Sequence, residues 1–60
     1  MVRYERGDVI LRIGSTQPLI VVRQHPDRFL VQYPNGLMRE LPAIEVENEF
    51  VLVQKWFGGF

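Results

Sequence analysis

The chain has 60 residues, no cysteine, and seven basic side chains balanced by seven acidic ones. A chain of this length forms one domain and buries only about 60% of the surface that its unfolded form exposes, so its stability requires an efficient apolar core or association with another chain. The absence of cysteine excludes disulfides and thiolate metal sites, and the longest aliphatic run, residues 19–22, is too short to cross a bilayer.

The chain alternates between short apolar segments and turn residues, which is typical of an all-β domain. The first strand is predicted at residues 9–13, with Val9, Leu11 and Ile13 on one face. A loop at residues 14–18 precedes a second strand at residues 19–24. Because that strand begins with four consecutive aliphatic residues, we expect it to be buried on both faces.

A hairpin is predicted in the middle of the chain. His25, Pro26 and Asp27 form a turn before a third strand at residues 29–33. Asn35 and Gly36 then favour a type I′ turn, since both residues tolerate positive φ values. The fourth strand follows at residues 37–41 and runs antiparallel to the third.

The last part of the chain holds one ambiguous segment and one strand. Pro42 opens a stretch, residues 42–48, that favours a single helical or 3₁₀ turn. The fifth strand is predicted at residues 50–54, before an aromatic tail at residues 55–60. This order predicts a single domain over residues 1–60, a small five-stranded SH3-like barrel with one short helical turn before the last strand. The alternative is an open sheet that pairs with a second copy.

Residues 6–54 resemble the small bacterial YodC-like family, whose function is not established. The resemblance lies in the opening residues 6–10, the loop from Gly14 and Ser15 to Pro18, the apolar strand after it, and the late hairpin with Gly36. It implies a short SH3-like barrel. The chain departs from the family in having no cysteine, no tryptophan in the third strand, and an added aromatic tail.

No catalytic or metal-binding constellation is predicted. Ser15, His25 and either Asp8 or Asp27 supply the residue types of a hydrolase triad, but a barrel of this size lacks the volume for a pocket that excludes water. The glutamates at positions 40, 45, 47 and 49 lack the Asp, Asn and Gly spacing of a calcium loop. We therefore expect a protein that is not an enzyme, with no metal or other cofactor.

Charge is distributed unevenly along the chain. Residues 1–39 carry six arginines and three acidic residues, whereas residues 40–60 carry Lys55 and four glutamates. Arginine pairs bidentately with carboxylates and phosphates. The tail concentrates Trp56, Phe57 and Phe60 within five residues, and such aromatic side chains either cap a small core or anchor a partner.

These features predict an interaction module that binds another protein through an Arg-rich face and the aromatic tail. The expected binding residues are Arg23, Arg28, Arg39, Tyr33, Trp56, Phe57 and Phe60. The alternative is a nucleic-acid-binding barrel that uses the same arginines with Tyr33. A third hypothesis is an oligomer whose central pore forms a ligand-binding or catalytic site. With no secretion signal in the first residues, a cytoplasmic protein without membrane contact is expected, and a homo-oligomer is one route to additional buried surface.

Overall fold

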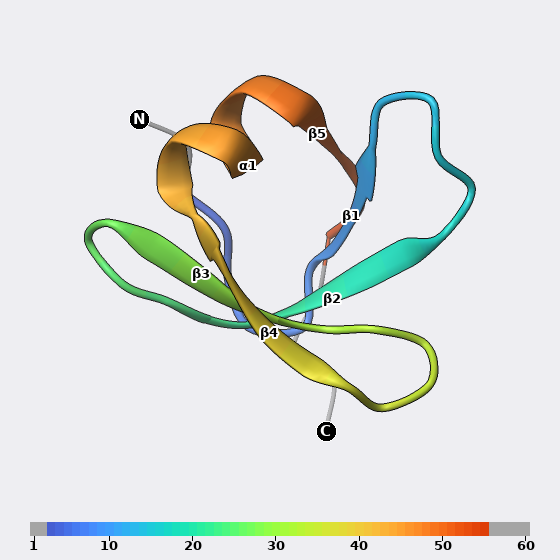
Figure 1. Cartoon of the computed structure of the whole chain (residues 1–60), viewed down its shortest axis with the longest axis horizontal. Helices are drawn as coiled ribbons and strands as arrows, with labels where there is room; N and C mark the ends of the chain where they lie inside the picture. Colours follow the sequence, from blue (N-terminus) through green and yellow to red (C-terminus); the bar gives the residue numbers. More distant parts are fainter. Residues whose placement is uncertain (1–2, 56–60) are drawn as a thin grey trace.

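The computed structural model describes residues 3–55, and these form one antiparallel sheet with a short helix (Figure 1). The strands occur in the order β4-β3-β2-β1-β5 across the sheet. Their bounds are Val9–Arg12 for β1, Pro18–Gln24 for β2, Arg28–Gln32 for β3, Met38–Pro42 for β4 and Phe50–Gln54 for β5, with α1 at Ala43–Glu49. The all-β class, the five strands and the helical turn before the last strand are therefore confirmed.

The closed barrel expected from the sequence is not observed. Each inner strand pairs with two neighbours, but β4 pairs only with β3 and β5 only with β1 within residues 3–55. Figure 1 shows α1 connecting these two outer strands across one end of a strongly bent sheet. The chain passes from β4 to β5 through this helix, and no β4–β5 pairing within residues 3–55 closes the ring, so the sheet keeps two edges.

The core lies on the concave face of the sheet, under α1. Its fully buried members include Ile10, Val21, Phe29 and Val31, with Val46 from the helix. The other core residues are Leu19, Leu41 and Phe50. On β3 the burial alternates strictly, as expected for a strand with one face on the core.

One prediction about strand faces is wrong, and β1 ends one residue before the predicted end at residue 13. Residues 19–22 of β2 are not buried on both faces, because Leu19 and Val21 are buried whereas Ile20 is exposed. On β1 the buried residue is Ile10, while Ile13 lies beyond the strand and is 66% exposed. Both strands have one face on the core, so their remaining aliphatic residues lie on the opposite face of the sheet.

The β3–β4 hairpin forms where predicted but with a different turn. No residue other than glycine has a positive φ in the described part of the chain, so Asn35 cannot occupy a type I′ turn. Instead, Gly36 N–H donates to the Tyr33 carbonyl at 2.9 Å and Tyr33 N–H donates to the Leu37 carbonyl. Pro34 fixes a negative φ at the first turn position, and Gly36 follows with a φ of 92°. This arrangement is a type I turn followed by a glycine bulge.

The helix is fixed at its start by the backbone and along its length by one arginine. Ala43 N–H donates to the Asp27 carbonyl at 2.9 Å. Arg12 on β1 forms ion pairs with Glu45 and Glu49, which lie one helical turn apart, and its guanidinium lies 4.6 Å from the ring centroid of Phe50. The hydrogen bond to Glu45 is the main cause of the raised pKa of Arg12. Arg12 therefore holds α1 against β1, and its charge is already neutralised.

Candidate functional site: a cationic groove beside the second strand

The N-terminal segment, residues 3–8, is bonded along the end of β2. Gly7 N–H donates to the Val21 carbonyl, and Val21 N–H donates to the Asp8 carbonyl, both at 2.8 Å. Further out, Tyr4 N–H donates to Oε1 of Gln24 at 2.9 Å. The segment therefore forms a fixed wall next to β2.

Asp8 anchors this wall from inside the protein. Its side chain is fully buried, and Oδ2 accepts hydrogen bonds from the Glu5 N–H at 2.9 Å and from Nζ of Lys55 at 3.1 Å. The same ammonium lies 3.9 Å from the Glu5 carboxylate. Buried carboxylates require such partners, because transfer of an unpaired charge out of water is costly. One carboxylate thus holds the N-terminal turn and the end of β5 together.

A β-bulge turns Arg23 away from the core. The pairing of β2 with β3 shifts between Val21 and Arg23, so that Val21 faces Val31 but Arg23 faces Leu30. Residues two apart on a regular strand share a face, and the extra residue, Val22, reverses this relation. As a result, Arg23 lies on the outer face of the sheet.

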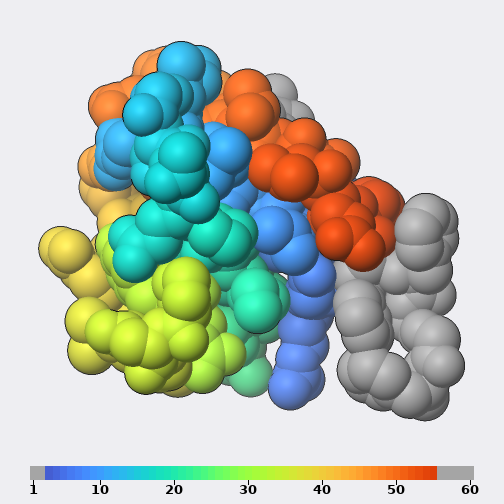
Figure 2. Space-filling model, turned by 90° about the vertical axis from the view of Figure 1, so that its right-hand side faces the viewer, coloured from blue at the N-terminus to red at the C-terminus, as the bar shows by residue number. Residues whose placement is uncertain are grey.

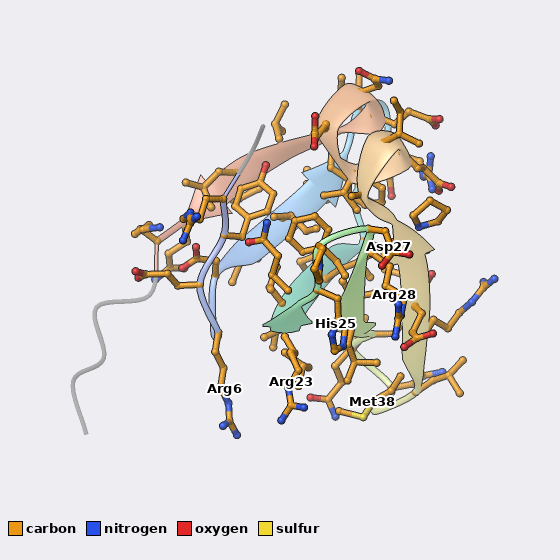
Figure 3. The ribbon with its side chains drawn as sticks, turned by 90° about the vertical axis from the view of Figure 1, so that its left-hand side faces the viewer. Arg6, Arg23, His25, Asp27, Arg28 and Met38 are labelled. Atoms are coloured by element: carbon orange, nitrogen blue, oxygen red, sulfur yellow. The ribbon has the colours of Figure 1, made fainter. Side chains whose placement is uncertain are left out.

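An open groove of about 530 Å³ lies between this wall and the bulged end of β2. Its lining residues are Arg3, Tyr4, Glu5, Arg6, Val22, Arg23, Gln24, His25 and Pro26. Figure 3 shows Arg6 and Arg23, from the two sides of the groove, extending in the same direction into solvent. No carboxylate among residues 3–55 forms an ion pair with Arg3, Arg6 or Arg23, and the single acidic lining residue, Glu5, is near Lys55. The groove therefore carries excess positive charge.

An aromatic contact stabilises the N-terminal wall of the groove. The Tyr4 ring lies 5.6 Å from the buried Phe29 ring, at an interplanar angle of 55°. Burial, together with the Asp8 carboxylate, raises the pKa of the Tyr4 phenol. Tyr4 therefore connects the N-terminal segment to the core.

The arginines predicted to share one face occupy three different environments. Arg23 lines the groove. Arg28 is paired with Asp27 at 2.9 Å and with Glu40 at 3.0 Å, and the Glu40 hydrogen bond is the main cause of its raised pKa. Arg39 is opposite Val31 and so lies on the other face of the sheet from Arg23. The structure therefore does not bring the three together.

The remaining predicted binding residues are aromatic. Tyr33 is half-buried and packs against the core cluster. Every aromatic ring within residues 3–55 is buried or half-buried, so this part of the chain offers no exposed stacking platform. Trp56, Phe57 and Phe60 lie outside the described residues. Lys55, the last described residue, contacts Asp8 and Glu5, so the chain leaves the described part next to the groove wall.

The residues weighed as a catalytic triad are separated. Ser15 precedes β2 and its Oγ accepts a hydrogen bond from Gln17 N–H, whereas His25 follows the other end of the same strand. Within residues 3–55, no cluster of three or more His, Cys, Asp or Glu side chains is arranged to hold a metal ion. The one described helix is too short to span a membrane.

Comparisons of the chain with protein-family models, with curated proteins and with solved structures found no match. The function of the groove is therefore inferred from the residues that line it. Arg3 and Arg6 were not among the predicted binding residues, although they belong to the arginine-rich first part of the sequence. The sequence holds no signal for the bulge that brings Arg23 to them.

Proposed function

We propose that this protein is a non-enzymatic interaction module of SH3-like strand order that binds an acidic segment of a partner protein in the cationic groove. The observation that carries the proposal is the excess of arginine on the two walls of the groove, where no carboxylate of residues 3–55 forms an ion pair with Arg3, Arg6 or Arg23. Three guanidinium groups within one open groove favour carboxylates in an extended segment, because arginine forms bidentate pairs with them. The fixed walls reduce the ordering cost of binding.

A single-stranded nucleic acid is the second candidate, since phosphates also pair with arginine. Such binders usually combine a basic surface with exposed aromatic side chains on which bases stack. In residues 3–55 the rings lie in or against the core, and the whole chain is neutral. These two features favour the acidic protein segment over nucleic acid.

The aromatic tail is the second proposed element of the binding surface. Lys55 lies against Asp8 and Glu5, which belong to the segment that forms a groove wall. The described part of the chain therefore ends next to a groove wall. Trp and Phe side chains are frequent anchors at protein interfaces, and this supports Trp56, Phe57 and Phe60 as contacts with the same partner.

The test is a titration of the full chain with a fluorescent oligoglutamate peptide and, separately, with oligothymidylate of similar length. We expect the peptide to bind at low salt, and we expect Arg23→Glu to weaken binding by at least about tenfold. Arg39→Glu is the matched control, since Arg39 is also exposed but lies on the other face.

Three outcomes would contradict the proposal. The first is no peptide binding at low salt, and the second is equal weakening by Arg23→Glu and Arg39→Glu. The third is tighter binding of oligothymidylate than of the peptide, with a steep salt dependence that indicates phosphate contacts. The third result would indicate that the groove binds single-stranded nucleic acid.

A further inference from the structure

Within residues 3–55, β5 is an apolar edge strand with one unpaired side. Val51, Leu52 and Val53 are consecutive and are 47%, 44% and 56% exposed. Figure 2 shows the side chains of β5, in orange-red, at the surface beside β1. Within residues 3–55, β5 pairs only with β1, so its other edge presents free backbone groups between exposed aliphatic side chains. Such edges are templates for strand pairing.

The opposite edge of the sheet, β4, is protected. It carries Arg39 and Glu40 in its centre and ends at Pro42, which lacks an N–H donor. Charged side chains and proline are the usual means by which proteins prevent pairing at an edge. β5 has neither between Phe50 and Gln54. The two edges are therefore not equivalent, and an open-ended stack of sheets through both edges is disfavoured.

The backbone of β5 directs specific groups outward. Ile13 N–H donates to the Glu49 carbonyl at 2.8 Å, and Val51 is opposite Leu11 two positions further along the antiparallel pair. Because hydrogen-bonded and non-bonded pairs alternate in such a ladder, Val51 bonds toward β1, whereas the N–H and C=O of Leu52 point to the free edge. Leu52 can therefore donate to and accept from a neighbouring strand without breaking the sheet.

We propose that β5 is the interface of a homodimer, in which β5 of a second copy adds antiparallel to this edge about a two-fold axis near Leu52. Antiparallel pairing of identical strands places the start of one beside the end of the other. Glu49 and Lys55, which flank β5, already form ion pairs with Arg12 and Asp8 of their own chain, so the exposed aliphatic side chains of β5 and the backbone groups of Leu52 provide the contact. Leu52 faces its own counterpart, and the valines on either side of it face each other.

The dimer is closed, because the interface uses the same surface on both copies and leaves only the protected β4 edges. It joins two five-stranded sheets into one continuous sheet. An interface built on one short strand lies at the small end of the range for specific association. Dimerisation is therefore concentration dependent, and it is independent of the cationic groove.

Sedimentation velocity of the full chain over a series of protein concentrations tests the proposal. We expect a monomer–dimer equilibrium in which Val53→Lys raises the dissociation constant by at least about tenfold, since lysine on an edge strand opposes pairing. Leu37→Lys is the matched control, because Leu37 is equally exposed, at 56%, but lies in the β3–β4 hairpin. Far-UV circular dichroism verifies that each variant is folded.

A second readout covers the case in which Val53→Lys fails to fold. Amide hydrogen exchange of the wild-type chain should show the Leu52 N–H becoming more protected as concentration rises, while the Leu37 N–H, which is bonded within its own hairpin, does not change. The dimer should also survive removal of residues 56–60. A monomer at every concentration, assemblies larger than a dimer, unchanged Leu52 exchange, or loss of the dimer on removal of the tail would each overturn the proposal.

Discussion

Asp8 offers a direct test of how this small sheet is held together. Its carboxylate is fully buried and accepts the Glu5 N–H and the Lys55 ammonium. Hydrogen bonds to charged groups contribute about 1.5–3 kcal/mol each when one partner is removed. Because Lys55 is partly exposed, its share is smaller. We therefore expect Asp8→Ala to lower the free energy of unfolding by about 2–3 kcal/mol.

That loss is large for a chain of this length, whose total stability is about 3–9 kcal/mol. With a urea dependence of about 1 kcal/mol per molar, the unfolding midpoint should fall by about 2–3 M. Asp8→Asn keeps an acceptor for Glu5 N–H but loses the charge, so its midpoint should lie between those of Asp8→Ala and the wild type.

Urea unfolding followed by far-UV circular dichroism is the assay, with Asp27→Ala as the control. Asp27 is also ion-paired, but its side chain is 76% exposed, and its midpoint should change by less than about 0.5 M. The reasoning about buried carboxylates would be refuted if Asp8→Ala and Asp27→Ala shifted the midpoint equally.

Three further predictions follow from individual contacts. The pKa of Tyr4 in the folded protein lies above its ordinary value of about 10. The contribution of Tyr4 to stability should therefore be constant below about pH 10 and be lost as the pH rises through the folded-state pKa. In unfolding experiments across this pH range, Tyr4→Phe should reduce the loss. Gly36→Ala should lower the free energy of unfolding by about 1–2 kcal/mol through backbone strain. Strain is the whole effect, because no atom lies within 4 Å of the added Cβ. Gly36→Asn should lower the free energy of unfolding by less in the same urea assay. Arg12→Ala should lower the thermal unfolding midpoint more than Arg39→Ala, and Arg12→Lys should have an intermediate effect. The reason is that Arg12, unlike Arg39, joins β1 to two helix carboxylates and to the Phe50 ring. Equal losses for Arg12→Ala and Arg39→Ala would contradict the role assigned to Arg12.

The positions of the strands and the helix could be read from the sequence with small errors at their ends. Turn residues and short apolar segments mark local structure, and these signals are strong in this chain. The burial of each face was less predictable. The sequence predicts an aliphatic face of Val9, Leu11 and Ile13, but Ile13 lies beyond β1 and the fully buried residue of the strand is Ile10. Apolar residues on both faces leave the alternation without a preferred register, so tertiary packing decides it.

The β3–β4 turn and the groove are two further features that the sequence did not predict correctly. Asn35 and Gly36 predict a tight hairpin, but the preceding Pro34 fits the first turn position better and moves the turn by one residue. The sequence predicts one arginine-rich face, and regular alternation along β2 would place Arg23 on the same face as Val21. The bulge at Val22 reverses that alternation for Arg23, and backbone bonds from Tyr4 and Gly7 set the N-terminal arginines beside it.

The most direct test of the proposed function is a map of the bound peptide by NMR. Amide shifts of the ¹⁵N-labelled full chain are followed during titration with oligoglutamate at low salt. The proposal predicts that the largest changes fall on residues 3–6 and 22–26, which line the groove, and that Arg23→Glu strongly reduces them at the same peptide concentration. Changes centred on Arg28 or Arg39, or shifts spread evenly over the sheet, would contradict it.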